Sequence, residues 1–401
     1  MDFKLLGSVL LVVGTSIGAG MLGLPIATAQ LGFATSLLLL FVCWAIMTVG
    51  ALLLLEVNLW LPQNNNIITM AGKTIGPVGQ IIGWISYLML LYALLCAYIA
   101  GGSDLLNNLL ASNGIVMARS VSSIVFTIIF GSIVYLGIRS VDYVNRGLMI
   151  VKFGALFLLI LLLASSISLP NYSSGVISQI TSSTAITVTV TSFGFATIVP
   201  SLRIYLGRDV VKLRKAILIG SIIPLICYIL WDAVIMGVIP MTGEHSLISI
   251  AQSKNSASDL VNTLTTLASS HSTVFFVKLF TSICVLTSFL GVSLCLVDFF
   301  SDGLNLEKQG MSKLGLHILT FLPPLIVVLF FPNAFIRALE YAGINCIVLL
   351  VLLPTWMAWK GRYSKELSNG FKVAGGKVLL FCMLVFSLVM VIRGIIGAIQ
   401  A

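Results

Sequence analysis

The segment Gly14-Thr-Ser-Ile-Gly-Ala-Gly20 places three glycines and two hydroxyls in the middle of an apolar run. Glycine weakens a helix, and a backbone group left unsatisfied in lipid costs several kcal/mol. A break of this kind therefore usually lines a cavity, where freed N–H groups can hold a carboxylate and freed carbonyls can hold a cation. The segment predicts a solute-binding site inside a membrane-spanning helix.

A second interruption lies at Ser192-Phe-Gly-Phe-Ala-Thr-Ile-Val-Pro200. Here a glycine is flanked by aromatic residues and followed by a proline, which cannot continue the hydrogen-bond ladder of a helix. Each break alone is also typical of a simple kink or of close helix packing through small residues. The pair in corresponding positions favours a transport site between two halves of the chain.

Two ionisable residues lie inside apolar runs, where a charge is a functional hypothesis by default. Lys152 is followed by a long apolar stretch, and removal from water disfavours its charged form, which suits proton exchange. Alternatively, Lys152 extends its side chain to the cytoplasmic interface. Glu340 is a candidate for proton transfer or gating, with a structural hydrogen-bonding role as the alternative.

Composition fixes the class of protein. Hydrophobic residues make up 59% and charged residues 9% of the chain, and the mean hydropathy is +1.11. Soluble domains carry about 25% charged residues, so we expect an all-helical integral membrane protein embedded in a lipid bilayer. The net charge of +9 comes from Lys and Arg in loops and does not indicate nucleic-acid binding. Seven scattered cysteines and three scattered histidines predict no disulfide framework and no metal site.

Apolar runs of about 20 residues predict membrane spans. We expect eleven, at 5–26, 33–57, 78–103, 120–138, 146–168, 184–204, 215–240, 273–298, 314–331, 334–358 and 374–398. With the N-terminus inside, sixteen of the 22 Lys and Arg residues fall on the cytoplasmic side and three on the external side. This bias predicts a cytoplasmic N-terminus and an external C-terminus. The polar loop at 241–272 is either a solvated connector or a set of short helices over an outer vestibule.

The two interrupted spans are five positions apart, which predicts two five-helix halves within one transmembrane domain, residues 1–401. The first half covers 1–168, the second 184–358, and the helix at 374–398 is additional. Because each half has an odd number of spans, the halves have opposite orientations in the bilayer.

Several motifs point to a known family. Gly14-Thr-Ser-Ile-Gly-Ala-Gly-Met-Leu-Gly-Leu-Pro25 resembles the first-helix signature of the hydroxy/aromatic amino acid permeases, in the amino acid–polyamine–organocation superfamily. Thr191-Ser-Phe-Gly-Phe195, Tyr92-Ala-Leu-Leu-Cys-Ala-Tyr98, Thr287-Ser-Phe-Leu-Gly-Val292 and Glu340-Tyr-Ala-Gly-Ile344 are similar to its tyrosine and tryptophan branch. The resemblance implies a leucine-transporter-type fold of five plus five inverted helices and proton-coupled symport of an amino acid across a bacterial inner membrane.

The resemblance also implies roles for residues of the two breaks. The N–H groups of Gly18, Ala19 and Gly20, with the hydroxyls of Thr15 and Ser16, would hold the substrate carboxylate. Backbone carbonyls from Phe193 through Gly194 and Phe195 to Ala196 would accept from its ammonium, and the two phenylalanines would wall an aromatic side chain. Of Tyr92 and Tyr98, at most one points directly at substrate, because residues six apart do not share a helix face.

In some members of the superfamily a lysine in the fifth helix stands where sodium binds in sodium-coupled members. Lys152 would then lie near the carbonyls of Gly14 and Ile17 and the hydroxyls of Thr287 and Ser288. If Lys152 points elsewhere, the two hydroxyls could serve a sodium ion instead. Branch members often carry a histidine after Phe-Gly-Phe, where this chain has Ala196. The substrate therefore stays open among tyrosine, tryptophan, phenylalanine and smaller neutral or hydroxylated amino acids.

We expect a secondary active transporter that uses no cofactor beyond a coupling proton or sodium ion. No GxxxxGK[ST] segment indicates ATP-driven transport. A membrane-embedded enzyme would need clustered Asp, His, Ser or metal ligands, which the sequence does not offer, and a receptor would need a soluble signalling domain. A passive channel or facilitator is the remaining alternative, and no sequence feature indicates an obligate protein partner.

Overall fold

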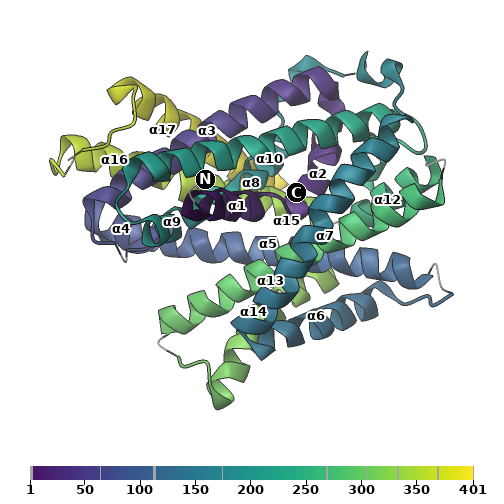
Figure 1. Ribbon diagram of the computed structural model, residues 1–401, viewed down its shortest axis with the longest axis horizontal. Coiled ribbons are helices and arrows are strands. Elements are labelled where there is room, and N and C mark those ends of the chain that lie inside the picture. Colours follow the sequence, from purple (N-terminus) through teal and green to yellow (C-terminus); the bar gives the residue numbers. More distant parts are fainter. Residues whose placement is uncertain are drawn as a thin grey trace.

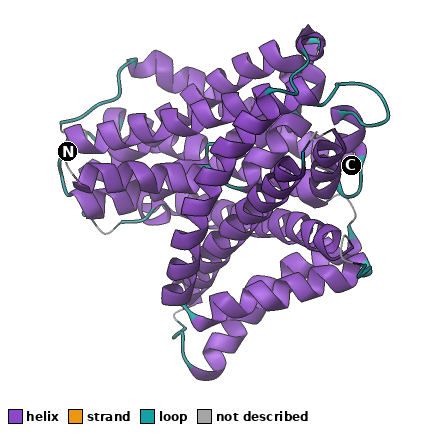
Figure 2. Ribbon diagram, turned by 45° about the vertical axis from the view of Figure 1, so that its right-hand side comes forward, coloured by secondary structure: helices purple, strands orange, loops and turns teal. Residues whose placement is uncertain are grey.

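The structure is a computed structural model that describes residues 3–63, 65–111, 114–173, 175–267, 270–304, 306–331, 334–367 and 370–400. Helices account for most of these residues, and none of them forms a strand (Figure 2). This follows from the apolar composition, because a helix satisfies its backbone hydrogen bonds within one segment and can therefore lie in lipid.

The elements of residues 3–181 follow the predicted apolar runs, with short helical turns between them. They are α1 (Phe3–Ser16), α2 (Ala19–Ala27), η1 (Ala29–Leu31), α3 (Gly32–Trp60), α4 (Ile67–Thr74), α5 (Pro77–Ala111), α6 (Arg119–Leu136), α7 (Ile138–Ala164), η2 (Leu169–Ser173) and η3 (Ile177–Thr181).

The rest of the described chain also forms both short and long helices. Its elements are α8 (Ser183–Ser192), η4 (Gly194–Ile198), α9 (Val199–Leu206), α10 (Val210–Val238), α11 (Leu247–Gln252), α12 (Ser256–Leu267), α13 (His271–Leu304), α14 (Gly310–Phe330), α15 (Ala334–Ile347), the π-helical turn η5 (Val348–Leu352), α16 (Leu353–Tyr363) and α17 (Gly376–Gln400).

Ten helical segments of the described chain are long and apolar enough to cross a membrane, and the bent pair α1–α2 makes an eleventh when it is taken as one span. The polar segment at 241–272 contains two short helices, α11 and α12. The first of them begins at a capping box, in which Ser246 and Ser249 each satisfy a backbone N–H of the other.

The chain is interrupted at both glycine-containing segments. Helix α1 ends at Ser16, Gly18 is fully extended at φ −156° and ψ −152°, and α2 leaves at 51° to α1. Helix α8 ends at Ser192, and the 3₁₀ turn η4 leads into α9, where Pro200 lies in the first turn. Proline is tolerated there because the first N–H groups of a helix have no intrahelical acceptor.

The long helices pack in two groups (Figure 1). In the first group, α10 packs on α1 and α3, and α3 packs on α8; α5, α6, α13 and α14 form the second group. Helix α7 packs mainly on α13, whereas α15 packs on both α5 and α8 and so links the groups. The two interrupted helices therefore lie in the same group and face the second one.

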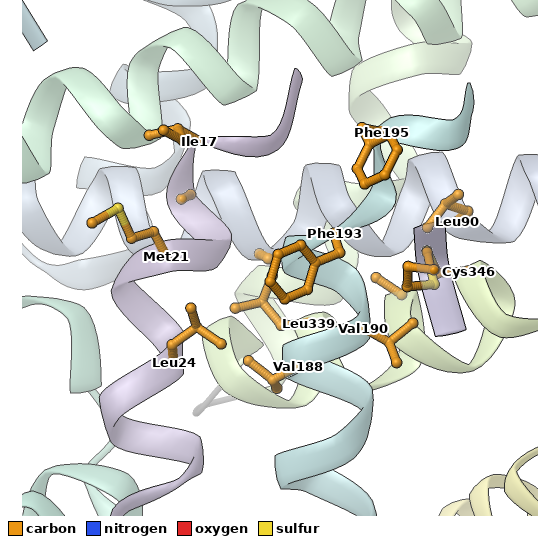
Figure 3. Close-up of a cluster of buried hydrophobic side chains, with 14 of the residues drawn as sticks. Ile17, Met21, Leu24, Leu90, Val188, Val190, Phe193, Phe195, Leu339 and Cys346 are labelled. Carbon is orange, nitrogen blue, oxygen red and sulfur yellow. The ribbon is translucent and has the colours of Figure 1, made fainter. Parts of the chain in front are cut away.

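The two interrupted helices run antiparallel. A Cβ atom built on Gly7 would lie 3.2 Å from the Tyr205 hydroxyl, and one on Gly20 would lie 3.1 Å from Ser192 Oγ. One on Gly23 would lie 3.4 Å from a methyl of Val188. Rising numbers on one helix thus meet falling numbers on the other. Figure 3 shows α2 and α8 side by side, with Ile17 and Phe195 where each chain turns out of its helix.

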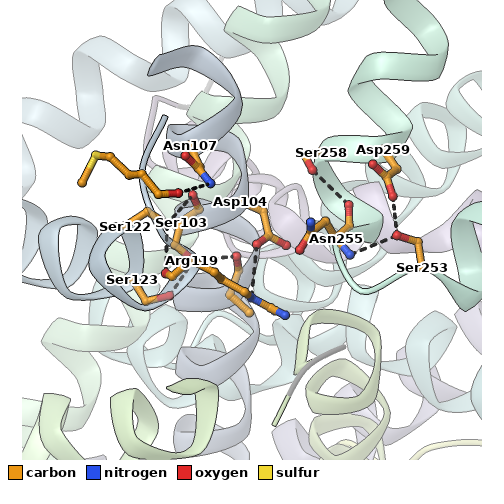
Figure 4. Close-up of polar contacts among 12 residues, drawn as sticks. Ser103, Asp104, Asn107, Arg119, Ser122, Ser123, Ser253, Asn255, Ser258 and Asp259 are labelled. Carbon is orange, nitrogen blue, oxygen red and sulfur yellow. Dashed lines mark hydrogen bonds and ion pairs between the residues drawn. The ribbon is translucent and has the colours of Figure 1, made fainter. Parts of the chain in front are cut away.

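Buried polar groups join helices at two places away from the breaks. Arg362 of α16 donates from Nε and Nη2 to the Glu56 carboxylate of α3, at 2.7 and 2.5 Å, and Val373 N donates to the same carboxylate at 2.8 Å. Between α5 and α6, Arg119 lies 3.7 Å from the carboxylate of Asp104 (Figure 4). These contacts fix helix ends relative to one another.

Candidate substrate and coupling site

A cavity of about 350 Å³ lies at the two interruptions. Residues of α1, α5, α7, η4 and α13 line it, which brings both groups of helices to one space. Among the residues that the sequence analysis assigned to substrate or coupling-ion binding, those that line it are Gly14, Thr15, Ser16, Ile17, Gly18, Gly20, Tyr98, Gly194, Thr287 and Ser288.

The cavity extends from the breaks toward the side on which α1 begins. Leu10 and Leu11 line it from α1, Asn145 and Met149 from α7, and Cys295 from α13. On the other side of the breaks the helices close on each other, since Gly20 lies against Ser192, and Gly23 against Leu339 of α15. The site is therefore open toward the side of the N-terminus and sealed on the opposite side.

Lys152 reaches the first break from α7. Its ammonium donates to the carbonyl of Ile17 at 2.6 Å and lies 3.4 Å from Thr287 Oγ1. The Thr287 hydroxyl donates to the carbonyl of Ile283 in its own helix at 2.9 Å, so its lone pair is available to the ammonium. Only 1% of Lys152 is exposed, which shows that its side chain turns into the protein rather than toward an interface.

Ser288 ties the second group of helices to the start of α2. Its Oγ accepts from the backbone N–H of Ala19 at 2.9 Å. A Cβ on Gly18 would collide with this same oxygen, so the close approach of α13 requires glycine there. The hydroxyl thus satisfies one of the N–H groups that the interruption leaves without an intrahelical partner.

Tyr228 of α10 joins the two interruptions directly. Its hydroxyl oxygen lies 2.7 Å from the carbonyl oxygen of Ser16 and 2.8 Å from that of Ser192. These two serines are the last residues of α1 and α8, whose final carbonyls need partners from outside the helix. The Tyr228 side chain is fully buried and contacts the Phe193 ring edge to face, with centroids 5.1 Å apart.

The other residues proposed from the sequence do not line this cavity. Phe193, Phe195 and Ala196 are fully buried, because η4 turns these apolar side chains into the helix packing. The Tyr92 hydroxyl donates to the Leu319 carbonyl of α14 at 2.8 Å.

Two further proposed groups are occupied by other contacts. The N–H of Ala19 is used by Ser288, and the Glu340 carboxylate accepts from Thr184 Oγ1 at 3.1 Å, on the sealed side of the site. Glu340 therefore links α15 to the start of α8 and lies outside the cavity.

Comparison with known proteins identifies the family. The model of the tryptophan/tyrosine permease family matches residues 1–394. The chain belongs to the tryptophan/tyrosine permease family. As a permease it is a transporter rather than an enzyme, and its span count is that of a multi-pass membrane protein.

The permease is similar along almost its whole length to proteins named as amino acid transporters. It is 36% identical over 391 residues to tyrosine-specific transport system 2 of Haemophilus influenzae, covering 97% of this chain and 95% of the relative. It is 37% identical over 383 residues to tyrosine-specific transport system 1 of the same organism, covering 95% and 94%. Glutamine transporter 2 of Aliivibrio fischeri is 31% identical over 408 residues, covering 98% and 100%.

Sequence reasoning missed several residues at the permease's site. Tyr228 gave no signal, because a single tyrosine in an apolar run is typical of ordinary packing. Tyr87, Asn145 and Cys295 line the cavity but belong to no motif that we singled out. Each lies at a distance along its helix from the break, where only tertiary packing decides which face meets the cavity.

Proposed function

We propose that the permease is a secondary active importer of an aromatic amino acid, tyrosine first, in a bacterial inner membrane. The observation that carries the proposal is the cavity at two facing helix interruptions, with a buried lysine bonded to the first of them. The two tyrosine-specific relatives, at 36% and 37% identity over nearly the full length, supply the substrate class.

Both ends of an amino acid zwitterion find partners at the interruptions. The start of α2 offers N–H groups to a carboxylate, from Gly18, which precedes the helix, and from Gly20 in its first turn, where the helix dipole favours negative charge. The carbonyls that end α1 and α8, at Ser16 and Ser192, present negative partial charge to an ammonium. Tyr98 and the leucines of α1 and α5 line the space left for an apolar or aromatic side chain.

The coupling ion in this proposal is a proton. The Lys152 ammonium lies beside the Ile17 carbonyl and the Thr287 hydroxyl, so a positive charge of the protein already fills the position that a sodium ion would take. Loss of that proton would remove the charged donor from Ile17 and loosen the first break. Sodium coupling is the alternative, and it requires Lys152 to leave this position so that Thr287 and Ser288 can bind the ion.

Alternating access would arise from two inverted halves, 1–168 and 184–358, with α17 outside the repeat. The antiparallel course of α1–α2 and α8–α9, each followed by a long helix, α3 and α10, supports this arrangement. With the N-terminus cytoplasmic, as the Lys and Arg distribution favours, the cavity is open inward and sealed outward.

A second candidate is transport of a smaller neutral amino acid such as glutamine. It rests on the relative from Aliivibrio fischeri, which is named as a glutamine transporter. Ala196 is buried where branch members often carry histidine, and this difference is compatible with a substrate side chain that is not aromatic.

Counterflow tests both candidates in one experiment. Purified protein is reconstituted in proteoliposomes, each proteinogenic amino acid is preloaded in turn, and uptake of radiolabelled tyrosine is measured. We expect a pronounced uptake transient with tyrosine and other aromatic preloads. Equal uptake with every preload, or uptake of glutamine but not of tyrosine in a matched assay with labelled glutamine, would overturn the aromatic assignment.

A further inference from the structure

The carbonyls of Ser16 and Ser192 share one hydroxyl. Tyr228 Oη lies 2.7 Å from the first and 2.8 Å from the second. A phenol carries a single O–H hydrogen, so it donates to one of these carbonyls at a time. The other carbonyl is left one donor short at a place where both serines line the cavity.

A carbonyl that lacks a donor inside a membrane protein has a strong tendency to take one from a ligand. An amino acid ammonium carries three N–H donors and a positive charge, and helix C-termini favour cations. The ligand group that fits between the ends of α1 and α8 is therefore a primary ammonium group.

We propose that Tyr228 is a positioning residue that holds the carbonyls of Ser16 and Ser192 together as an acceptor pair for the substrate's α-ammonium. This inference rests on the proposed function and deepens it, because it gives Tyr228 and its helix α10 a part in substrate recognition. The hydroxyl acts through these carbonyls, and the Tyr228 side chain does not line the cavity itself.

The packing around Tyr228 holds its side chain in one position. The side chain is fully buried, and its ring is held against Phe193, which directly follows Ser192. On the other side, α10 packs closely on α1, since a Cβ built on Gly220 would lie 2.6 Å from Val12 Cβ. Both carbonyls are thus held by one helix, through the single hydroxyl of Tyr228.

The inference predicts a specific change in ligand preference. Binding of L-tyrosine and of its deaminated analogue, 3-(4-hydroxyphenyl)propionate, is compared on the purified full-length protein by displacement of radiolabelled tyrosine. Wild type should prefer tyrosine. In Tyr228→Phe the preference should fall by about tenfold, because the acceptor pair is no longer held in place, while the affinity for the analogue should change little.

Tyr172→Phe is the matched control. The Tyr172 hydroxyl donates to the carbonyl of Ala233 at 2.7 Å, and Ala233 belongs to α10, the helix that carries Tyr228. The variant therefore removes another hydrogen bond from a tyrosine hydroxyl to a backbone carbonyl, outside the site. Its preference for tyrosine over the analogue should equal that of wild type. Phe193→Leu removes the ring that supports Tyr228 and should also lower the preference for tyrosine over the analogue. It replaces Tyr228→Phe as the test if Tyr228→Phe does not fold.

The possible results distinguish a failure of the proposed function from a failure of the inference about Tyr228. A wild-type protein that binds no tyrosine would overturn the proposed function and this inference with it. Equal binding of tyrosine and the analogue by wild type would overturn the inference and leave transport intact. An unchanged or increased preference in folded Tyr228→Phe and Phe193→Leu would assign Tyr228 to packing alone.

Discussion

The ammonium nitrogen of Lys152 lies 2.6 Å from the carbonyl oxygen of Ile17, and this bond joins α7 to the interruption of the first helix. None of the ion pairs in the described part of the chain involves Lys152. Its charge is held by a carbonyl and a hydroxyl, a weaker set of partners than a carboxylate. In this position the Lys152 ammonium is held by neutral groups of α13 and of the first break.

Lys152→Gln should separate coupling from exchange. Glutamine keeps an N–H donor for Ile17 but carries no proton that can be released. We expect counterflow without a gradient to persist, while accumulation driven by an imposed proton gradient falls to the level that the substrate gradient alone sets. Lys278→Gln, at a lysine near the start of α13 and outside the cavity, is the control and should accumulate substrate as wild type does. Full gradient-driven accumulation in Lys152→Gln would contradict the assigned role.

Two glycines of the first break should differ sharply in their tolerance of a methyl group. In Gly18→Ala the new methyl would meet Ser288 Oγ, which is held by the N–H of Ala19. In Gly14→Ala it would meet the terminal methyl of Met149 at 2.9 Å, which can rotate away. Overpacking costs about 1–3 kcal/mol, so we expect about a ten- to hundredfold loss of counterflow rate for Gly18→Ala. Gly14→Ala should lose far less, and similar losses in the two variants would argue against this account of the close approach.

The sequence predicted the helices better than the site. Long apolar runs had to become helices in a membrane, so the expected span at 78–103 appears within α5 (Pro77–Ala111). Glycine and proline marked the interruptions, because their effect on a helix is local. The direction in which Phe193 and Phe195 point was not predictable, since it depends on how η4 rotates against its neighbours. The contact of Tyr228 with two serine carbonyls joins three separate segments and leaves no local trace.

The buried pair of Glu56 and Arg362 predicts a stability effect away from transport. Both side chains are almost fully buried, with 0% and 5% exposed. Removing one partner leaves an uncompensated buried charge, so Glu56→Ala should cost about 3–5 kcal/mol of folding free energy. The double variant Glu56→Ala/Arg362→Ala should recover part of that loss, because no lone charge remains. Apparent melting temperatures of the detergent-solubilised proteins measure both effects, and a double variant less stable than Glu56→Ala would contradict the explanation.

The side on which the cavity opens can be read from a native cysteine. Cys295 lines the cavity on the side of the N-terminus, and its side chain is exposed. A membrane-impermeant thiol reagent should modify it in inside-out vesicles and leave it unmodified in right-side-out vesicles, and saturating substrate should slow the reaction. Buried Cys43 is the internal control, and mass spectrometry locates the label. Modification from the outer side alone would reverse the orientation assigned to the chain.

The most direct test of proton-driven aromatic amino acid transport is uptake of radiolabelled tyrosine into proteoliposomes under an imposed proton gradient, acidic outside. The account predicts accumulation above the external concentration, its collapse when a protonophore is added, and no comparable effect of a sodium gradient. Uptake that only equilibrates under every gradient would indicate a passive facilitator. Absence of tyrosine uptake by folded protein under all conditions would contradict the central claim.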